Sequence, residues 1–131
     1  MPVIYLAAPY SPVRKTFEIG LSKPDYSEED KKLKEERFWQ INRVAAKLYK
    51  NGFTVISPIT ETHLLHSECN LPGTFEFWMP HNYNLILRSD MVFVLMLEGW
   101  KDSTGINGEV AFAEQKNIPV IYIDEELKIG G

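Results

Sequence analysis

Hydrophobic residues along the chain fall into four short, nearly uninterrupted apolar runs. The runs span residues 3–8, 53–56, 90–97 and 118–123, and a proline, a glycine or a polar cluster follows each of them. Apolar runs of this length without polar alternation are typical of strands buried on both faces of a parallel sheet. We therefore predict four strands, and the third has the clearest buried pattern.

Between these runs, apolar residues recur at helical spacing. The longest such segment is Lys34–Lys50, followed by Asn51-Gly52, a left-handed stop that is common at helix ends. Its apolar positions, three and four residues apart, are Phe38, Ile41, Val44, Ala45 and Leu48. Shorter helices are predicted over Asn82–Ser89 and Glu109–Lys116.

Two segments show neither the apolar run of a buried strand nor the helical spacing of apolar residues. Residues 12–32 are polar and end in a cluster of charges, so we predict a loop there. Residues 59–80 are also irregular, but their aromatic side chains argue against disorder. We expect this second segment to line a pocket.

Strands that alternate with helices indicate the α/β class. We predict one domain over residues 1–131 with four strands and three helices in alternation. The architecture is a doubly wound parallel sheet, Rossmann-like or flavodoxin-like, of four to five strands with flanking helices and right-handed crossovers. A chain of 131 residues with 44% hydrophobic and 24% charged residues is ordinary for a single globular core.

Composition excludes several partners. The formal net charge is -4 and basic residues form no stripe, so we expect no nucleic-acid polymer as partner. No apolar stretch reaches the roughly 20 residues of a membrane span, and no secretory signal is recognisable, so we expect no membrane partner and a cytoplasmic location. Cys69 is the only cysteine and fits a reducing compartment. Its spacing from His63 and His66 matches no zinc motif, and we expect neither metal nor cofactor.

Candidate chemistry lies where the predicted strands end, because ligands of open parallel sheets bind outside the carboxyl ends of the strands. Three loops begin there, at residues 8–11, 57–58 and 98–100. These loops can bring together six side chains of interest: Tyr5, His63, Trp78, Asn82, Ser103 and Glu109.

The segment from Ser103 to Gly108 combines hydroxyls and glycines at the entry to a helix, which is the chemistry of a small anion cradle. The alternative is an ordinary N-cap. Glu109 would then lie in the first helical turn, where the macrodipole favours an ionised carboxylate and so a competent nucleophile. The same placement would also serve helix stability alone.

Three aromatic residues admit two interpretations. Tyr5 lies in an otherwise apolar strand, so its buried hydroxyl needs a partner such as a carboxylate, although tyrosines also serve as core residues. Trp78 and Trp100 would stack on a base or a sugar, or would simply pack.

Taken together, five stretches resemble the nucleoside 2-deoxyribosyltransferase superfamily. They are residues 4–11 (IYLAAPYS), Asn82 placed eight residues before Asp90, Gly99-Trp100, residues 102–105 (DSTG) and residues 109–113 (EVAFA). The resemblance covers nearly the whole chain. It is greatest to small bacterial and phage members and to the nucleoside 5′-monophosphate N-glycosidases of that superfamily.

The resemblance implies that Glu109 attacks C1′ of the sugar, displaces the base and forms a glycosyl-enzyme, while Tyr5 orients the nucleophile. It also implies at least a homodimer, in which a neighbour closes each pocket. Together with the strand-end placement, it predicts that the following residues contact a small-molecule nucleotide: Ala8, Pro9, Ser11, His63, Trp78, Trp100, Ser103 and Gly105.

Ser103 bears on the substrate. Deoxyribosyltransferases carry an aspartate at this position, which contacts the sugar 5′-hydroxyl, whereas the monophosphate hydrolases carry serine. An aspartate would repel a phosphate dianion, but a serine hydroxyl beside glycine amides donates hydrogen bonds to it. Ser103 therefore favours a nucleotide, provided that the side chain of the adjacent Asp102 turns away.

Asn82 departs from the pattern, since the superfamily has an aspartate there that protonates the departing base. Asparagine can hydrogen-bond the base but cannot supply a proton. Another acid such as His81 or His63 would then act, or the base leaves unaided, or the protein is inactivated or binds without turnover. We hypothesise impaired catalysis with binding retained.

The sequence thus predicts an N-glycosidase that hydrolyses a (deoxy)nucleoside 5′-monophosphate through a covalent Glu109 intermediate. The alternatives are a nucleoside deoxyribosyltransferase, a catalytically weak protein that sequesters a nucleotide, and a structural α/β domain without a ligand.

Overall fold

A computed structural model describes residues 2–11 and 28–130 of the chain. The described residues form one four-stranded sheet in the order β2-β1-β3-β4, with every pair of neighbouring strands parallel. The strands are β1 (Val3–Ala7), β2 (Thr54–Ile56), β3 (Met91–Leu95) and β4 (Val120–Ile123). All four predicted strands are confirmed, and this order is that of flavodoxin-like doubly wound sheets.

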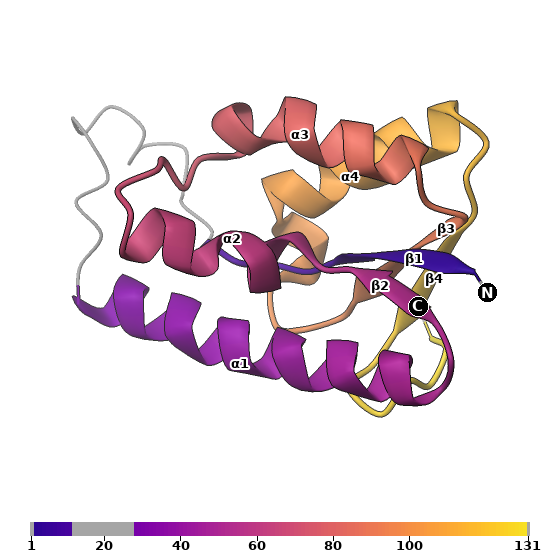
Figure 1. Cartoon of the computed structure of the whole chain (residues 1–131), viewed down its shortest axis with the longest axis horizontal. Helices are drawn as coiled ribbons and strands as arrows, with labels where there is room; N and C mark the ends of the chain where they lie inside the picture. Colours follow the sequence, from indigo (N-terminus) through magenta and orange to yellow (C-terminus); the bar gives the residue numbers. More distant parts are fainter. Residues whose placement is uncertain (1, 12–27, 131) are drawn as a thin grey trace.

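Helices cover both faces of the sheet (Figure 1). They are α1 (Glu28–Lys50), α2 (Pro58–Ser67), α3 (Phe75–Leu87) and α4 (Thr104–Gln115), with a short 3-10 helix η2 (Trp100–Asp102). The apolar stripe of α1 packs on one face in a cluster that includes Ile4, Leu6 and Phe93. On the other face, α3 and α4 pack against Tyr5, Ala7 and the central residues of β3. The predicted α/β class is confirmed.

The helix predicted over Lys34–Lys50 is confirmed, but it begins earlier, at Glu28. Its first turn holds Glu28, Glu29 and Asp30, whose negative charges are favourable at a helix N-terminus. This turn has no apolar stripe, so the spacing of apolar residues did not predict it. The prediction of a loop over residues 12–32 is therefore wrong for residues 28–32, and its remainder lies outside the described residues.

The irregular segment predicted over residues 59–80 is wrong, because α2 and the first half of α3 occupy most of it. Helix α2 begins at Pro58, a residue suited to the first helical position. Its buried residues are Pro58 and His63, so it has no apolar stripe to detect. Thr74 caps α3, and the helix predicted over Asn82–Ser89 is the second half of this longer helix.

The last helix also begins earlier than predicted. Ser103 is the N-cap of α4, and its side chain accepts a hydrogen bond from the backbone N–H of Ile106. Helix α4 starts at Thr104, so Glu109 lies in the second turn and not in the first. Its first two turns contain two glycines, and because glycine has a low helix propensity, the sequence pattern did not reveal where the helix begins.

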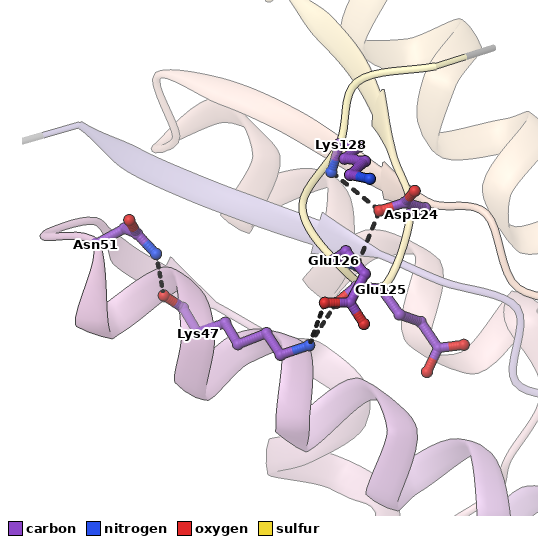
Figure 2. A network of polar contacts seen from close by, with 6 residues as sticks. All are labelled: Lys47, Asn51, Asp124, Glu125, Glu126 and Lys128. Atoms are coloured by element: carbon purple, nitrogen blue, oxygen red, sulfur yellow. Dashed lines mark hydrogen bonds and ion pairs between the residues drawn. The ribbon is translucent and has the colours of Figure 1, made fainter.

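A polar network fixes the chain after β4 against α1 (Figure 2). Asp124 Oδ1 accepts hydrogen bonds from the backbone N–H groups of Glu126 and Lys128, at 2.8 and 2.9 Å. Lys47 Nζ, on α1, donates to the carbonyl of Glu125 at 2.7 Å. These contacts tie the turn after β4 to the last turn of α1.

Among the residues that the structure describes, no helix combines the length and the apolar character that a bilayer span requires.

Candidate active site

A cavity of about 540 Å³ lies at the carboxyl end of the sheet. Its wall is built by the residues after β1, by the starts of α2 and α4, and by the first turns of α3. The chain leaves β1 toward β2 on one side and β3 lies on the other side, so this is the switch point at which doubly wound sheets bind ligands. The volume falls within the range of small-molecule sites, roughly 300–1,000 Å³.

Most of the predicted site residues line this cavity. They are Tyr5, Ala8, Ser11, Trp78, Asn82, Ser103, Gly105 and Glu109. The strand-end loops therefore bring together side chains that are far apart in the sequence. Pro9, His63 and Trp100, also predicted to contact the substrate, are not part of the lining of this cavity as the structure describes it.

The centre of the site is a contact between Tyr5 and Glu109. The Tyr5 hydroxyl, from β1, donates a short hydrogen bond to Glu109 Oε2, from α4. Tyr5 is fully buried and Glu109 is 7% exposed. Glu109 shares the buried stripe of α4 with Ile106 and Ala113, so a carboxylate stands where the core would otherwise place an apolar side chain. The carboxylate partner expected for the Tyr5 hydroxyl is present.

Burial dominates the electrostatics of Glu109. It raises the pKa of the carboxyl from 4.5 to about 7, and hydrogen bonds from Tyr5 and Asn82 oppose this shift. The first-turn macrodipole invoked from the sequence does not act here, since Glu109 lies in the second turn of α4. The pKa of Tyr5 is raised well above its usual value by burial and by the charge of Glu109, which keeps its hydroxyl a donor.

Asn82 reaches the same carboxylate from α3, because its side chain hydrogen-bonds Glu109. An amide donates to a carboxylate without carrying charge, so it stabilises the ionised form. Tyr83, the next residue, donates instead to the backbone carbonyl of Gly108 at 3.1 Å and stacks on Phe112 at 4.2 Å between ring centroids. Asn82 and Tyr83 thus hold α3 against α4 beside Glu109.

At the start of α4, the alternative interpretation of Ser103 as an N-cap is confirmed, and the anion site stays a prediction. Ser103 Oγ accepts from Ile106 N at 3.2 Å, and its own proton remains to be donated. The amides of Thr104 and Gly105 belong to the first turn, which has no intrahelical carbonyl partners. Ser103, Thr104 and Gly105 all line the cavity.

Two further acidic residues, Glu76 and Asp102, line the cavity. That the side chain of Asp102 turns away from the site stays a prediction. Within residues 2–11 and 28–130, neither lysine nor arginine is part of the lining. Binding of a dianion here depends on hydroxyl and amide donors.

His63 is buried behind the cavity wall and is 3% exposed. Its Nδ1 contacts the hydroxyl of Tyr10 at 2.5 Å, and its Nε2 contacts Glu35 Oε2 at 2.9 Å. The ring stacks on Phe38 at 4.3 Å. His63 thus reaches the cavity only through Tyr10, which lines it.

The two tryptophans lie in different places. Trp78 lines the cavity, and its Nε1 donates to the carbonyl of Pro72 at 2.7 Å. Trp100 packs against Tyr122 instead, at 5.3 Å between ring centroids. His81, considered as a substitute acid, is exposed with its ring 5.8 Å from that of Trp78, and it belongs to a shallower neighbouring hollow.

The lining also includes residues that were not predicted, among them Tyr10, Thr74 and Phe75. Tyr10 lies within the loop that follows β1, and this position alone could have identified it. Thr74 and Phe75 begin a helix that the sequence pattern did not reveal. In the described part of the chain, no group of three histidine, cysteine, aspartate or glutamate residues is arranged to hold a metal ion, and Cys69 is exposed.

A family model described as a domain of unknown function, DUF1937, matches residues 2–125. The chain belongs to the DUF1937 family. No curated protein matches this DUF1937 sequence. A solved structure of the 2-deoxyribosyltransferase from the psychrotolerant bacterium Bacillus psychrosaccharolyticus is similar to it, with 24% sequence identity and a TM-score of 0.49, over 98% of this chain and 77% of that chain.

Proposed function

We propose that this DUF1937 protein cleaves the N-glycosidic bond of a nucleoside 5′-monophosphate, with Glu109 as the nucleophile. The observation that carries the proposal is the buried Glu109 carboxylate, which opens into a cavity of about 540 Å³ and is held by Tyr5 and Asn82. Burying a carboxyl group reduces the stability of a folded protein, and buried groups with shifted pKa values are typical of functional sites.

In the proposed reaction, the ionised Glu109 carboxylate attacks C1′ of the sugar. The C1′–N bond breaks, the base departs with its electron pair, and a glycosyl ester of Glu109 forms. Water then attacks C1′ and releases the sugar 5-phosphate and the carboxylate. The Tyr5 hydroxyl fixes one carboxylate oxygen, which leaves the other to attack.

The preference for a 5′-monophosphate rests on the start of α4. The Ser103 hydroxyl and the amides of Thr104 and Gly105 offer donors at a helix N-terminus, where an anion is favoured. The resemblance of residues 102–105 and 109–113 to the monophosphate N-glycosidases supports the same preference.

A nucleoside is the second candidate substrate, and Asp102 favours it. Asp102 lines the cavity directly before Ser103, and Glu76 lines it as well. Two negative charges oppose a phosphate dianion but accept hydrogen bonds from a free 5′-hydroxyl. With such a substrate, a second base in place of water would resolve the glycosyl-enzyme, and the protein would be a deoxyribosyltransferase.

One experiment separates these candidates. The protein is incubated with matched nucleosides and 5′-monophosphates, ribo and deoxy, with and without a second free base, and the products are separated by chromatography. Free base released from monophosphates, and lost in Glu109→Gln, supports the proposal. Exchange of bases between nucleosides supports the transferase. Binding of a nucleotide without release of base supports a sequestering protein and contradicts both enzymatic candidates.

The covalent step is tested by intact mass. A 2′-fluoro arabino analogue of the accepted substrate slows the second step, because fluorine destabilises the oxocarbenium-like transition state. A mass increase equal to the fluorinated sugar, absent in Glu109→Gln, is expected. A homodimer and a cytoplasmic location stay predictions.

A further inference from the structure

A chain of three polar groups leads from the cavity to the surface. The Tyr10 hydroxyl lies 2.5 Å from His63 Nδ1, and His63 Nε2 lies 2.9 Å from Glu35 Oε2. Tyr10 lines the cavity. The side chain of His63 is 4% exposed, whereas that of Glu35 is 57% exposed. The order is therefore a phenol in the cavity, a buried imidazole behind it and a carboxylate in contact with solvent.

The imidazole is fixed from several sides. It stacks on Phe38 with 21° between the ring planes, and the ring of Tyr10 meets it edge-on at 5.7 Å. The Trp39 indole N–H donates to the other carboxylate oxygen of Glu35 at 3.3 Å. A histidine held by a carboxylate on one nitrogen and touching a hydroxyl with the other has the arrangement in which imidazole moves protons.

The proposed reaction needs such a proton, because a base departing from C1′ carries an electron pair. Asn82 has no proton to give, and the Tyr5 hydroxyl is committed to Glu109. His81 lies in the neighbouring hollow. Tyr10 lines the cavity, and its hydroxyl contacts an acid–base group, the imidazole of His63.

We propose that Tyr10 protonates the departing base and that His63, held by Glu35, resupplies its proton; this inference rests on the proposed N-glycosidase function. Before the step, His63 carries a proton on each nitrogen, with Nδ1–H directed to Tyr10 and Nε2–H to Glu35. As the C1′–N bond breaks, the Tyr10 hydroxyl proton passes to the base nitrogen. The Tyr10 oxygen takes the Nδ1 proton, and neutral His63 keeps Nε2–H on Glu35.

Charge balances in this step, since the positive charge of His63 is lost as the base leaves neutral. When water then attacks C1′ of the glycosyl ester, its proton passes to the Tyr10 oxygen and the Tyr10 hydroxyl proton passes to Nδ1, which restores a proton on each nitrogen of His63. Lys34 Nζ lies 5.0 Å from the centre of the Tyr10 ring, where a cation stabilises developing phenolate charge. Tyr10 is thus the acid, and His63 and Glu35 are positioning residues that act through it.

The test compares substrates that differ in their need for an acid. A purine 5′-monophosphate needs protonation, whereas its N7-methyl counterpart carries a cationic base that leaves neutral. Uracil and the more acidic 5-fluorouracil form the matching pyrimidine pair. General acid catalysis contributes about 10²–10⁴-fold. We expect Tyr10→Phe to slow the ordinary nucleotide by at least about 100-fold and to slow the activated one far less.

Glu35→Gln probes the relay at an exposed position, where folding is little affected. It is expected to slow the ordinary nucleotide several-fold and to act less on the activated one. Glu36→Gln, an equally acidic and exposed neighbour on α1, is the matched control and should leave both rates in place. Glu109→Gln should abolish cleavage of both substrates.

The outcomes separate the inference from the function on which it rests. If Tyr10→Phe or Glu35→Gln slows both substrates of a pair equally, or slows neither, the relay is overturned while the N-glycosidase stands. If the wild-type protein cleaves no substrate of either pair, both the relay and the N-glycosidase function are contradicted. Thermal unfolding of each variant shows whether a loss common to both substrates comes from misfolding.

Discussion

The hydroxyl of Tyr5 on β1 donates to the carboxylate of Glu109 on α4 across 104 positions of sequence, and both side chains are buried. The contact joins the middle of the sheet to the helix that covers it. Burial raises the pKa of Glu109 to about 7, and the hydrogen bond from Tyr5 limits the rise. If Glu109 is the nucleophile, as proposed, this pair couples both the activity and the stability of the protein to pH.

The first prediction concerns stability. The folded carboxyl of Glu109 titrates at about 7 and the unfolded one near 4.5, so between these pH values the folded state holds a proton that the unfolded state has released. Its contribution to stability is present below pH 4.5 and falls as pH rises to 7, by about 3 kcal/mol. Glu109→Gln removes this penalty. In urea unfolding, the variant should match the wild type at pH 5 or below and exceed it at pH 8.

Glu114→Gln is the control, because Glu114 is exposed on the same helix. It should change the free energy of unfolding little at either pH. Equal stability of wild type and Glu109→Gln at pH 8 would contradict a raised pKa for Glu109.

The second prediction concerns the pH dependence of kcat/KM. In the proposed reaction the nucleophile is the ionised carboxylate of Glu109, so activity should be lost as pH falls through about 7. Tyr5→Phe removes a hydrogen bond that lowers the pKa of Glu109, and the inflection should move to higher pH. Rates measured from pH 5 to 9 would show a variant that is slow at pH 7 and partly recovers in alkali.

Tyr83→Phe is the matched control, since the Tyr83 hydroxyl bonds the carbonyl of Gly108 and not the carboxylate. The inflection should stay in place in this variant. A Tyr5→Phe profile that is lowered equally at every pH would mean that Tyr5 does not tune Glu109.

The third prediction concerns Asn82→Asp. The asparagine side chain hydrogen-bonds Glu109 and lowers its pKa, whereas an aspartate would place a second carboxylate beside it. We expect a slower reaction at pH 7 and an inflection at higher pH. A faster reaction would instead show that this protein lacks an acid, as the sequence suggested, and would argue against Tyr10 in that role. Steady-state rates of the two proteins at pH 6, 7 and 8 decide between these results.

The sequence pattern predicted the strands of the sheet more accurately than the helices around the site. The four strands were predictable because each is a continuous apolar run between two helical layers. Helix α2 was not, since tertiary contacts bury only Pro58 and His63 on it. The start of α4 was hidden by Gly105 and Gly108, and with it the fact that Glu109 shares a buried stripe with Ile106 and Ala113.

Several candidate residues were correctly predicted from the sequence, whereas the placement of others depends on packing. Tyr5, Ser103 and Glu109 follow from position along the chain, and all line the cavity. His63 was expected at the substrate, but its partners Glu35 and Tyr10 come from other segments and place it behind the wall. Side-chain contacts of this kind have no signature in a single sequence.

The last prediction uses the two glycines of α4. A Cβ at Gly105 would meet no protein atom closer than 3.8 Å, yet Gly105 lines the cavity. Gly105→Ala should therefore keep or raise stability, by up to about 1 kcal/mol from helix propensity, while it weakens nucleotide binding. A Cβ at Gly108 would lie 2.7 Å from Phe75 Cζ and 3.1 Å from Tyr83 Oη, so Gly108→Ala should destabilise the protein by about 1–3 kcal/mol from overpacking.

Thermal unfolding and calorimetric titration with a 5′-monophosphate measure the two effects separately. Substituting Gly105 alters the space in front of the first-turn amides without moving the helix, so a loss of affinity in a fully stable variant would locate the phosphate there. Unchanged affinity for the monophosphate would remove the support that the start of α4 gives to a nucleotide substrate. Asp102, an acidic residue that lines the cavity, would then be the main observation that bears on the substrate, and the nucleoside would become the better candidate.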